Sequence, residues 1–282
     1  MNTPASIADL IDLDRYPLDR IGSPQWQALI DDCRRQYAKQ GAANLHGFVR
    51  QEALPALAEE AKHLLKGGLK KKRVRTAFFH EDEPEYPEGH PRRRQWPDDV
   101  LQLAYDQIPV DALIRTIYEW DPLTEFIRVV EGRDTLYRMA DEFQALNLTA
   151  LADGEMQPWH FDANDFTITL LLQASEEGGD FNYATELRQD GNPDYETISR
   201  IFDGDMSKVR TLERGAGTLT LFRGRNAFHV VTPVKGKDQR ITAIMTYDEK
   251  PDCVAGERGN TFIYGPRVAE IYRRRREAAK AP

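Results

Sequence analysis

The sequence predicts a mainly β fold with flanking α-helices, whose core is a jelly roll, or double-stranded β-helix. From residue 144 onward, apolar residues recur with period two in short segments separated by turn residues. Upstream of that point, apolar residues recur at helical spacing instead. A chain of 282 residues that is 40% hydrophobic is long enough to bury one large core.

We therefore expect a single domain over residues 1–282. Its helical N-terminal part spans residues 1–143 and includes a lid loop at about 66–98. The jelly-roll core covers residues 144–265, and a C-terminal helix covers residues 266–282.

The N-terminal part begins with an irregular stretch over residues 1–22 and then shows clear helix signals. Ser23 and Pro24 suit the N-cap and the first position of a helix that runs to about Lys39. Further along, the pattern predicts a short strand at 42–49 and helices at 51–66, 110–120 and 121–130.

The segment 66–98 differs in kind, because a basic run is followed by an acidic run and then by a second basic run. Four prolines exclude a continuous helix. The segment is either a solvated loop with internal charge pairing or a lid that offers an arginine to an anionic substrate group. Arg75 is the best candidate for that arginine, because residues 73–79 alternate like a strand that could hold the guanidinium rigidly.

Eight strands suit a jelly roll with turn signals between them. They are predicted near 144–152, 157–162, 166–173, 180–184, 217–223, 227–233, 239–247 and 261–264. Residues 188–214 interrupt the strands with an insertion that includes a short helix at 194–202. Residues 268–280 are predicted to form an exposed basic helix.

The predicted site lies in the segment Gln157-Pro-Trp-His-Phe-Asp162. Residues i and i+2 of a strand point to one face, so His160 and Asp162 can reach one metal ion. His229, in a later apolar strand, would complete a two-His-one-carboxylate set with open positions on the metal. The simpler alternative is a structural histidine capped by an aspartate at a strand end.

These residues, together with Arg240, resemble the metal and co-substrate set of the iron(II)- and 2-oxoglutarate-dependent oxygenases. The run from His160 to Gln173, followed by Glu176-Glu-Gly-Gly-Asp-Phe-x-Tyr183, resembles the branch that contains the free-lysine halogenases and related amino-acid hydroxylases. The resemblance covers about residues 44–265.

The resemblance implies Fe(II), 2-oxoglutarate and O2 as cofactor and co-substrates. Arg240 would bind the far carboxylate of 2-oxoglutarate as a bidentate pair. From its place on the same strand face as Arg240, Thr246 is either a contact for substrate or co-substrate oxygen or a strand-forming threonine with a satisfied hydroxyl. Arg223 and Arg225 are rivals to Arg240, but they fall in a turn before His229 and are expected to be structural or at the mouth.

The resemblance also implies substrate contacts, which we assign to Arg75, Asn147, Gln157 and Asp165. In the halogenase branch an arginine in the region of Arg75 binds the amino-acid carboxylate. This sequence has Gln157 where that branch has a histidine, and Ala163 where it has an acidic residue. Both differences put lysine as the substrate in doubt. Asp165 or Asn164 would supply the missing polar contact.

One departure concerns the reaction itself. Halogenases of this branch have glycine in place of the carboxylate ligand, which frees a metal position for chloride. Asp162 fills that position here, so the sequence predicts hydroxylation of a small polar molecule, such as a free amino acid or a derivative. Two alternatives stay open: an oxygenase that modifies a protein or nucleic-acid group, and a non-catalytic, cupin-like metal-binding protein.

Composition narrows the partners and the location. The net charge of −8 argues against nucleic acid as the main partner. Two widely separated cysteines favour a reduced cytoplasmic protein. No apolar run reaches the roughly 18 residues of a membrane span, and the start lacks a signal-peptide pattern. We therefore expect a cytoplasmic enzyme that acts on a small molecule and does not bind a membrane. The sequence is compatible with a monomer or a homodimer.

Overall fold

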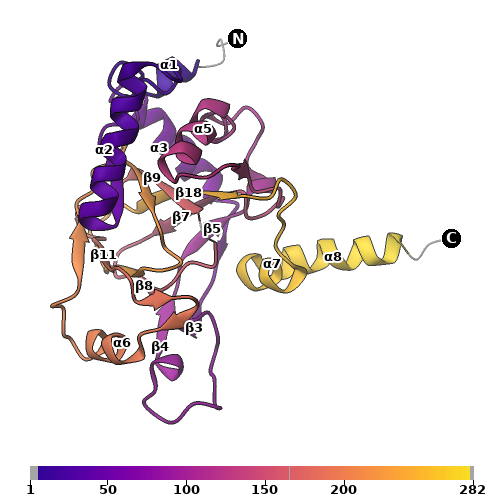
Figure 1. Cartoon of the computed structure of the whole chain (residues 1–282). Coiled ribbons are helices and arrows are strands. Elements are labelled where there is room, and N and C mark those ends of the chain that lie inside the picture. Colours follow the sequence, from indigo (N-terminus) through magenta and orange to yellow (C-terminus); the bar gives the residue numbers. More distant parts are fainter. Residues whose placement is uncertain (1–5, 165, 280–282) are drawn as a thin grey trace.

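Two antiparallel sheets form the centre of the computed structural model, which describes residues 6–164 and 166–279 (Figure 1). The larger sheet contains, in spatial order, β1 (Ala42–Leu45), β15 (Leu219–Phe222), β9 (Phe166–Gln173), β18 (Arg240–Asp248), β7 (Leu146–Leu151), β5 (Leu101–Leu103) and β2 (Leu69–Lys70), with β6 (Tyr137–Arg138) beside β18. The smaller sheet contains β14 (Arg210–Leu212), β11 (Phe181–Ala184), β16 (Phe228–Val231) and β8 (Gln157–His160). Between β7 and β18 the chain passes repeatedly from one sheet to the other, which confirms the predicted double-stranded β-helix.

Three short ribbons lie outside these sheets. They are β3 (Arg73–Thr76) with β4 (Gln95–Asp98), β10 (Glu177–Gly178) with β17 (Val234–Lys235), and β12 (Arg188–Gln189) with β13 (Asn192–Pro193). The β3–β4 ribbon and α6 (Tyr195–Phe202) lie together at the end of the molecule opposite the N-terminal helices (Figure 1).

The long strand β18 shows how the larger sheet separates a packed face from a polar face. Ile241, Ala243 and Met245 are fully buried in the main hydrophobic cluster, which also contains residues of the N-terminal helices. Successive side chains of a strand point to opposite faces, so Arg240, Thr242 and Thr246 face the other way, into the space between the sheets. Polar groups of this strand are therefore available to a site inside the barrel.

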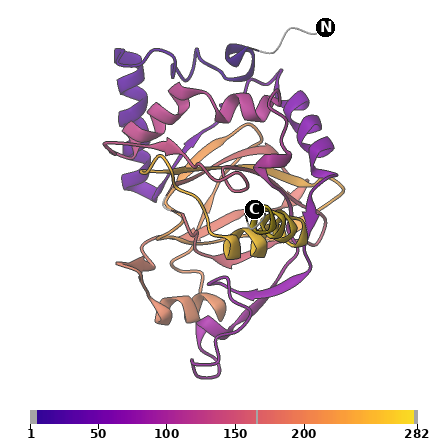
Figure 2. The same cartoon turned by 90° about the vertical axis from the view of Figure 1, so that its right-hand side faces the viewer.

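Helices cover the apolar face of the larger sheet (Figure 2). They are α1 (Ile7–Leu10), α2 (Pro24–Gln40), α3 (Leu54–Leu65), α4 (Leu113–Tyr118) and α5 (Asp121–Val130), with 3-10 turns η1 (Pro91–Arg93) and η2 (Tyr105–Gln107) elsewhere. Helix α2 begins as predicted: the Ser23 hydroxyl accepts a hydrogen bond from the Trp26 amide over 3.1 Å. It ends at Gly41, where φ is 78° and a Cβ would lie 2.4 Å from Thr185 Cγ2, so glycine is required there.

The predicted strand at 261–264 is wrong, because these residues lie in helix α7 (Glu257–Tyr264). Asn260 and Tyr264 are both buried, and their spacing of four residues matches one face of a helix rather than of a strand. Helix α8 (Pro266–Ala278) follows and projects from the body (Figure 1), as the sequence predicted. Its arginines form ion pairs with Glu142, Glu257, Glu270 and Glu277.

No helix in the described part of the chain is long and apolar enough to cross a membrane.

Candidate functional site

The two histidines of the predicted site meet across a pair of antiparallel strands. His160 of β8 lies opposite His229 of β16, and the register shifts just beyond this pair. The two imidazole centroids are 4.0 Å apart. Asp162 follows two residues after His160, just beyond the end of β8.

The three side chains converge on one point. Oδ1 of Asp162 lies 3.6 Å from Nε2 of His160 and 3.4 Å from Nε2 of His229. One nitrogen or oxygen from each residue lies within 4.8 Å of the others, a spacing that could hold one metal ion. Both imidazoles are almost fully buried, whereas the Asp162 side chain keeps partial exposure.

Backbone carbonyls fix the orientation of each imidazole. His160 Nδ1 lies 2.8 Å from the Pro158 carbonyl, and His229 Nδ1 lies 3.0 Å from the Ala227 carbonyl. A carbonyl only accepts, so each Nδ1 donates a proton to it and each Nε2 faces Asp162. Two imidazoles and one carboxylate on one side of a point, without cysteine, fit ferrous iron.

The environment of His160 and Asp162 favours the protonation states that a metal requires of these two ligands. Burial, reinforced by His229, lowers the pKa of His160 to about 4, so the imidazole is neutral at neutral pH. Burial opposes ionisation of Asp162, but the two histidines outweigh it and hold the pKa of the carboxyl well below its usual range.

Gly224 makes room for the Asp162 carboxylate. The Asp162 amide donates to the Gly224 carbonyl over 3.0 Å. A Cβ built on Gly224 would lie 1.9 Å from Oδ2 and 2.5 Å from Cγ of Asp162, so any larger residue would displace the carboxylate. Sequence analysis missed Gly224, although its place in the turn before His229 was visible.

A cavity of about 150 Å³ opens beside His160 and Asp162. Four residues predicted from the sequence line it: Arg75, Asn147, Gln157 and Thr246. Gln157 Nε2 lies 3.3 Å from His160 Nε2, and the Asn147 side-chain oxygen accepts hydrogen bonds from Gln102 and Tyr264. Asp165, the fifth residue assigned to the substrate or co-substrate, lies outside the described residues.

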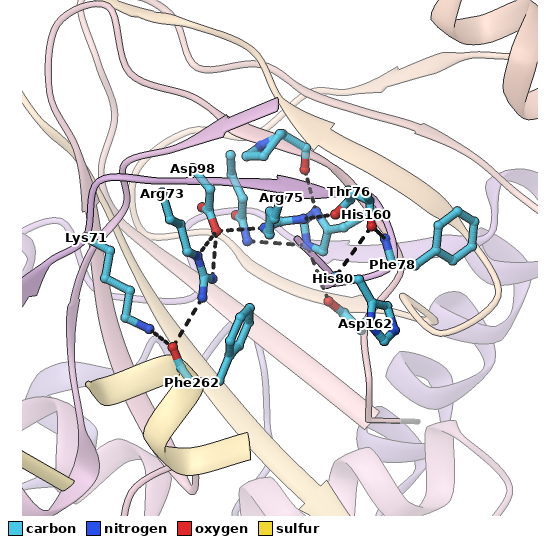
Figure 3. Close-up of polar contacts among 12 residues, drawn as sticks. Lys71, Arg73, Arg75, Thr76, Phe78, His80, Asp98, His160, Asp162 and Phe262 are labelled. Carbon is cyan, nitrogen blue, oxygen red and sulfur yellow. Dashed lines mark hydrogen bonds and ion pairs between the residues drawn. The ribbon is translucent and has the colours of Figure 1, made fainter. Parts of the chain in front are cut away.

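The β3–β4 ribbon contributes a row of basic side chains to this cavity (Figure 3). Arg75 is 1% exposed and donates through Nε to Asp98 Oδ2 over 2.6 Å. Its guanidinium lies over the Phe79 ring, and that ring is 5.6 Å from the His160 imidazole. Arg75 therefore stands next to the candidate metal centre, on a strand within the segment predicted as a lid.

Arg240 lines a second cavity, of about 430 Å³, on the other side of the site. Its Nε donates to the Gly179 carbonyl over 2.9 Å, and its Nη1 donates to Thr242 over 2.6 Å. Burial lowers the pKa of Arg240 to about 10, still far above neutrality. Phe181, which also lines this cavity, lies 5.4 Å from the His229 ring, so the cavity adjoins the three converging side chains.

Arg214 is a second guanidinium in the same cavity, and sequence analysis missed it. It comes from the turn before β15 and donates to Thr169 over 2.8 Å, while its buried Nε has no hydrogen-bond partner among the described residues. Burial and the nearby Arg240 hold the pKa of Arg214 well below its usual range. Two cations that share a cavity can hold a carboxylate between them.

Arg223, considered as a rival to Arg240, points elsewhere. Its side chain is 53% exposed and lies 3.1 Å from Glu131.

Comparison with known proteins identifies the family and the fold of this chain. A profile of the halogenase D family matches residues 25–260. A search of curated protein sequences finds no match. AviO1 from Streptomyces viridochromogenes Tue57 superposes with a TM-score of 0.54 at 13% identity, covering 79% of this chain and 96% of that one.

Two further structures share the fold. The carbocyclase SnoK from nogalamycin biosynthesis has a TM-score of 0.54 at 13% identity, covering 79% of this chain and 85% of its own. A 2-oxoglutarate–Fe(II) oxygenase family protein from Burkholderia pseudomallei has a TM-score of 0.50 at 13% identity, covering 79% and 92%. At these identities the superpositions establish the fold alone. The match over most of the sequence places this chain in the halogenase D family, within the iron(II)- and 2-oxoglutarate-dependent oxygenase superfamily.

Proposed function

We propose that this protein is an iron(II)- and 2-oxoglutarate-dependent dioxygenase that hydroxylates an unactivated carbon of a small polar molecule, a free amino acid or a close derivative. The observation that carries the proposal is the Asp162 carboxylate, directed at the same point as two oriented imidazoles. A chain with this third ligand has no metal position reserved for chloride, in contrast to the glycine-containing halogenases that it resembles. The family description alone would favour halogenation.

Three groups of residues would have separate roles: metal binding, 2-oxoglutarate binding and substrate binding. His160, Asp162 and His229 would hold iron on one face and leave the opposite face open. Bound iron, with 2-oxoglutarate and dioxygen, supplies the oxidation of an unactivated C–H bond. The protein binds the reactants, sets their orientation and excludes water.

Arg240 and Arg214 would bind the far carboxylate of 2-oxoglutarate. Both guanidiniums line the cavity that adjoins His229, and neither forms an ion pair within residues 6–164 and 166–279. The substrate would occupy the smaller cavity beside His160, against Arg75, Asn147, Gln157 and Thr246. Thr246 lines this cavity rather than the one with Arg240, so its hydroxyl is better placed for substrate than for the far carboxylate.

The size of the substrate cavity favours a small molecule over a macromolecular group. A volume of about 150 Å³ between the β3–β4 ribbon, β7 and α7 suits a compact ligand, whereas a polymer needs a groove that continues past the site. The proposed partner is therefore a small molecule, with neither nucleic acid nor membrane involved.

The test is turnover with defined products. Purified protein with Fe(II), 2-oxoglutarate, chloride and oxygen would be screened against the common amino acids for succinate release. Mass spectrometry would identify the product, with labelled dioxygen as the oxygen source. We expect a product heavier by one oxygen atom that carries the label. A chlorinated product from the wild-type protein, or no succinate with any small molecule, would overturn the proposal.

A further inference from the structure

The substrate cavity is lined by an excess of basic side chains. Lys71, Arg73 and Arg75 all come from the segment around β3, and all three border the cavity. In the described part of the chain, Asp98 is the sole carboxylate lining this cavity apart from Asp162, which belongs to the metal centre.

Asp98 is already shared between two of these cations (Figure 3). Its Oδ2 accepts from Arg75 Nε over 2.6 Å and from Arg73 Nε over 2.8 Å. Burial opposes ionisation of Asp98, but the two arginines outweigh it and hold its pKa below the usual value. One carboxylate balances one of two guanidiniums, so a unit of positive charge remains before Lys71 is counted.

Lys71 adds a further basic group whose hydrogen-bond partner is neutral. Its ammonium donates to the Phe262 backbone carbonyl, which is neutral, and Arg73 donates to the same oxygen over 3.2 Å. Burial, with Arg73 nearby, lowers the pKa of Lys71 to about 7. A buried cation that lacks an anion destabilises the protein, and such groups gather where a charged ligand binds.

Several other residues that line the cavity are neutral. Gln102 and Tyr264 both donate to the side-chain oxygen of Asn147. A substrate with a cationic side chain would add a second cation, besides the α-ammonium that every amino acid carries, to a cavity already lined by Lys71, Arg73 and Arg75, at a large electrostatic and desolvation cost.

We infer that the substrate is a small acidic molecule with two anionic groups, of the class of the dicarboxylic amino acids, rather than a neutral or cationic amino acid. This inference rests on the proposed function. One anion lies at Arg75, next to Phe79 and the metal centre. The other lies toward Lys71 and Arg73, against Phe262 of α7. One anion offsets the guanidinium charge that Asp98 leaves unbalanced, and the other pairs with the protonated form of Lys71.

The test compares acids with their own amides. Isothermal titration would measure the binding of L-glutamate, L-glutamine, L-aspartate, L-asparagine and L-lysine to the Fe(II) protein under anaerobic conditions. Saturating 2-oxoglutarate keeps these ligands out of the cavity with Arg240. O-phosphoserine tests whether the second anion must be a carboxylate. Each acid should bind at least about tenfold tighter than its amide, and lysine should bind weakest.

The variant Lys71→Gln should reduce the acid-over-amide preference to about twofold while leaving the affinity for glutamine unchanged. Lys72→Gln is the matched control, because Lys72 is exposed and does not line the cavity. Thermal unfolding of both variants checks that the fold is intact. Equal affinity for acids and amides in the wild-type protein, tighter binding of lysine, or an equal effect of both variants would overturn the inference.

Binding and succinate assays on the same proteins distinguish a failure of this inference from a failure of the proposed function. If air is admitted and succinate forms with a neutral or cationic amino acid while the acids do not bind, the inference fails and the oxygenase stands. If the acids bind with the expected preference but no tested amino acid releases succinate, the inference stands and the proposed reaction fails.

Discussion

Gly224 and Asp162 are in direct contact beside the candidate metal centre. The backbone amide of Asp162 donates to the Gly224 carbonyl over 3.0 Å, and the carboxylate lies where a side chain at position 224 would have to be. The turn that precedes His229 therefore positions the third ligand as well as the second. A residue that never touches the metal thus decides whether the carboxylate can reach it.

Gly224→Ala should separate these two residues. The new methyl group would lie 1.9 Å from Oδ2 of Asp162, so the carboxylate has to move away from the two imidazoles. We expect Fe(II) affinity to fall by about 10-fold to 100-fold, as for other residues that orient a ligand. Competition with a chelator measures this loss. Gly256→Ala is the control, since a Cβ there meets nothing within 4 Å; equal losses in both variants would contradict the steric argument.

Asp162→Gly should expose a metal position to chloride. Removing the carboxylate leaves two imidazoles and vacates the side of the metal that Asp162 faces. We expect hydroxylation to fall by at least about 100-fold and chloride to alter the visible spectrum of the Co(II)-loaded protein. Asp162→Asn keeps the shape without the charge and should show no chloride response. A chloride response in both variants, or in neither, would count against this account of the third ligand.

Arg214→Gln and Arg240→Gln should each weaken 2-oxoglutarate binding without changing metal affinity. Either substitution leaves one guanidinium in the cavity, so we expect a loss of about 10-fold to 100-fold for each. Titration of 2-oxoglutarate into Mn(II)-loaded protein measures binding independently of turnover. Lys208→Gln is an exposed control. An unchanged affinity in Arg214→Gln would mean that 2-oxoglutarate does not bind to Arg214, whose buried Nε has no hydrogen-bond partner among the described residues.

The metal centre was predictable because its signal is local. His160 and Asp162 are two residues apart, which in an extended segment directs both side chains to one face, although β8 itself ends at His160. His229 could be added because it lies in a recognisable apolar strand, and pairing of the two strands then sets both imidazoles opposite each other. The strands β9 and β18 were equally clear, since their apolar residues alternate over many positions.

The parts that were missed depend on contacts between distant segments. Arg214 follows an exposed glutamate in a turn, and nothing local shows that its side chain enters the barrel to reach Thr169. The short apolar run of α7 suits a strand as well as a helix, and the burial of Asn260 and Tyr264 against other elements decides between them. Lys71 contacts Phe262 across 191 positions, so the place of Lys71 at the substrate cavity could not be foreseen.

The metal-free protein should lose stability as the pH falls below about 6.5. In the unfolded chain His160 takes a proton near 6.5, whereas burial keeps the folded imidazole neutral down to about 4. Between these values the unfolded state binds more protons, so acid favours unfolding, by about 3 kcal/mol in all. Urea unfolding at several pH values measures the slope. His160→Gln should flatten it over this window, and an unchanged slope in that variant would assign the acid sensitivity to other groups.

Binding of an acidic substrate should weaken as the pH rises above about 7. The pKa of Lys71 in the free protein is about 7, because burial and Arg73 disfavour its charge more strongly than Asp98 favours it. A bound anion raises this pKa, so the free protein must take up a proton on binding once the pH exceeds about 7. We expect L-glutamate affinity to be flat below that point and to fall by up to about tenfold for each pH unit above it.

Titration in two buffers of different ionisation enthalpy would reveal that proton. At about pH 8, the apparent binding enthalpy should differ between the buffers, and at about pH 6 the difference should vanish. Lys71→Gln removes the titrating group and should abolish both the pH slope and the buffer dependence, whereas Lys72→Gln should retain them. A slope that survives in Lys71→Gln would place the proton on another group of the cavity and would leave the Lys71 ammonium without a role in substrate binding.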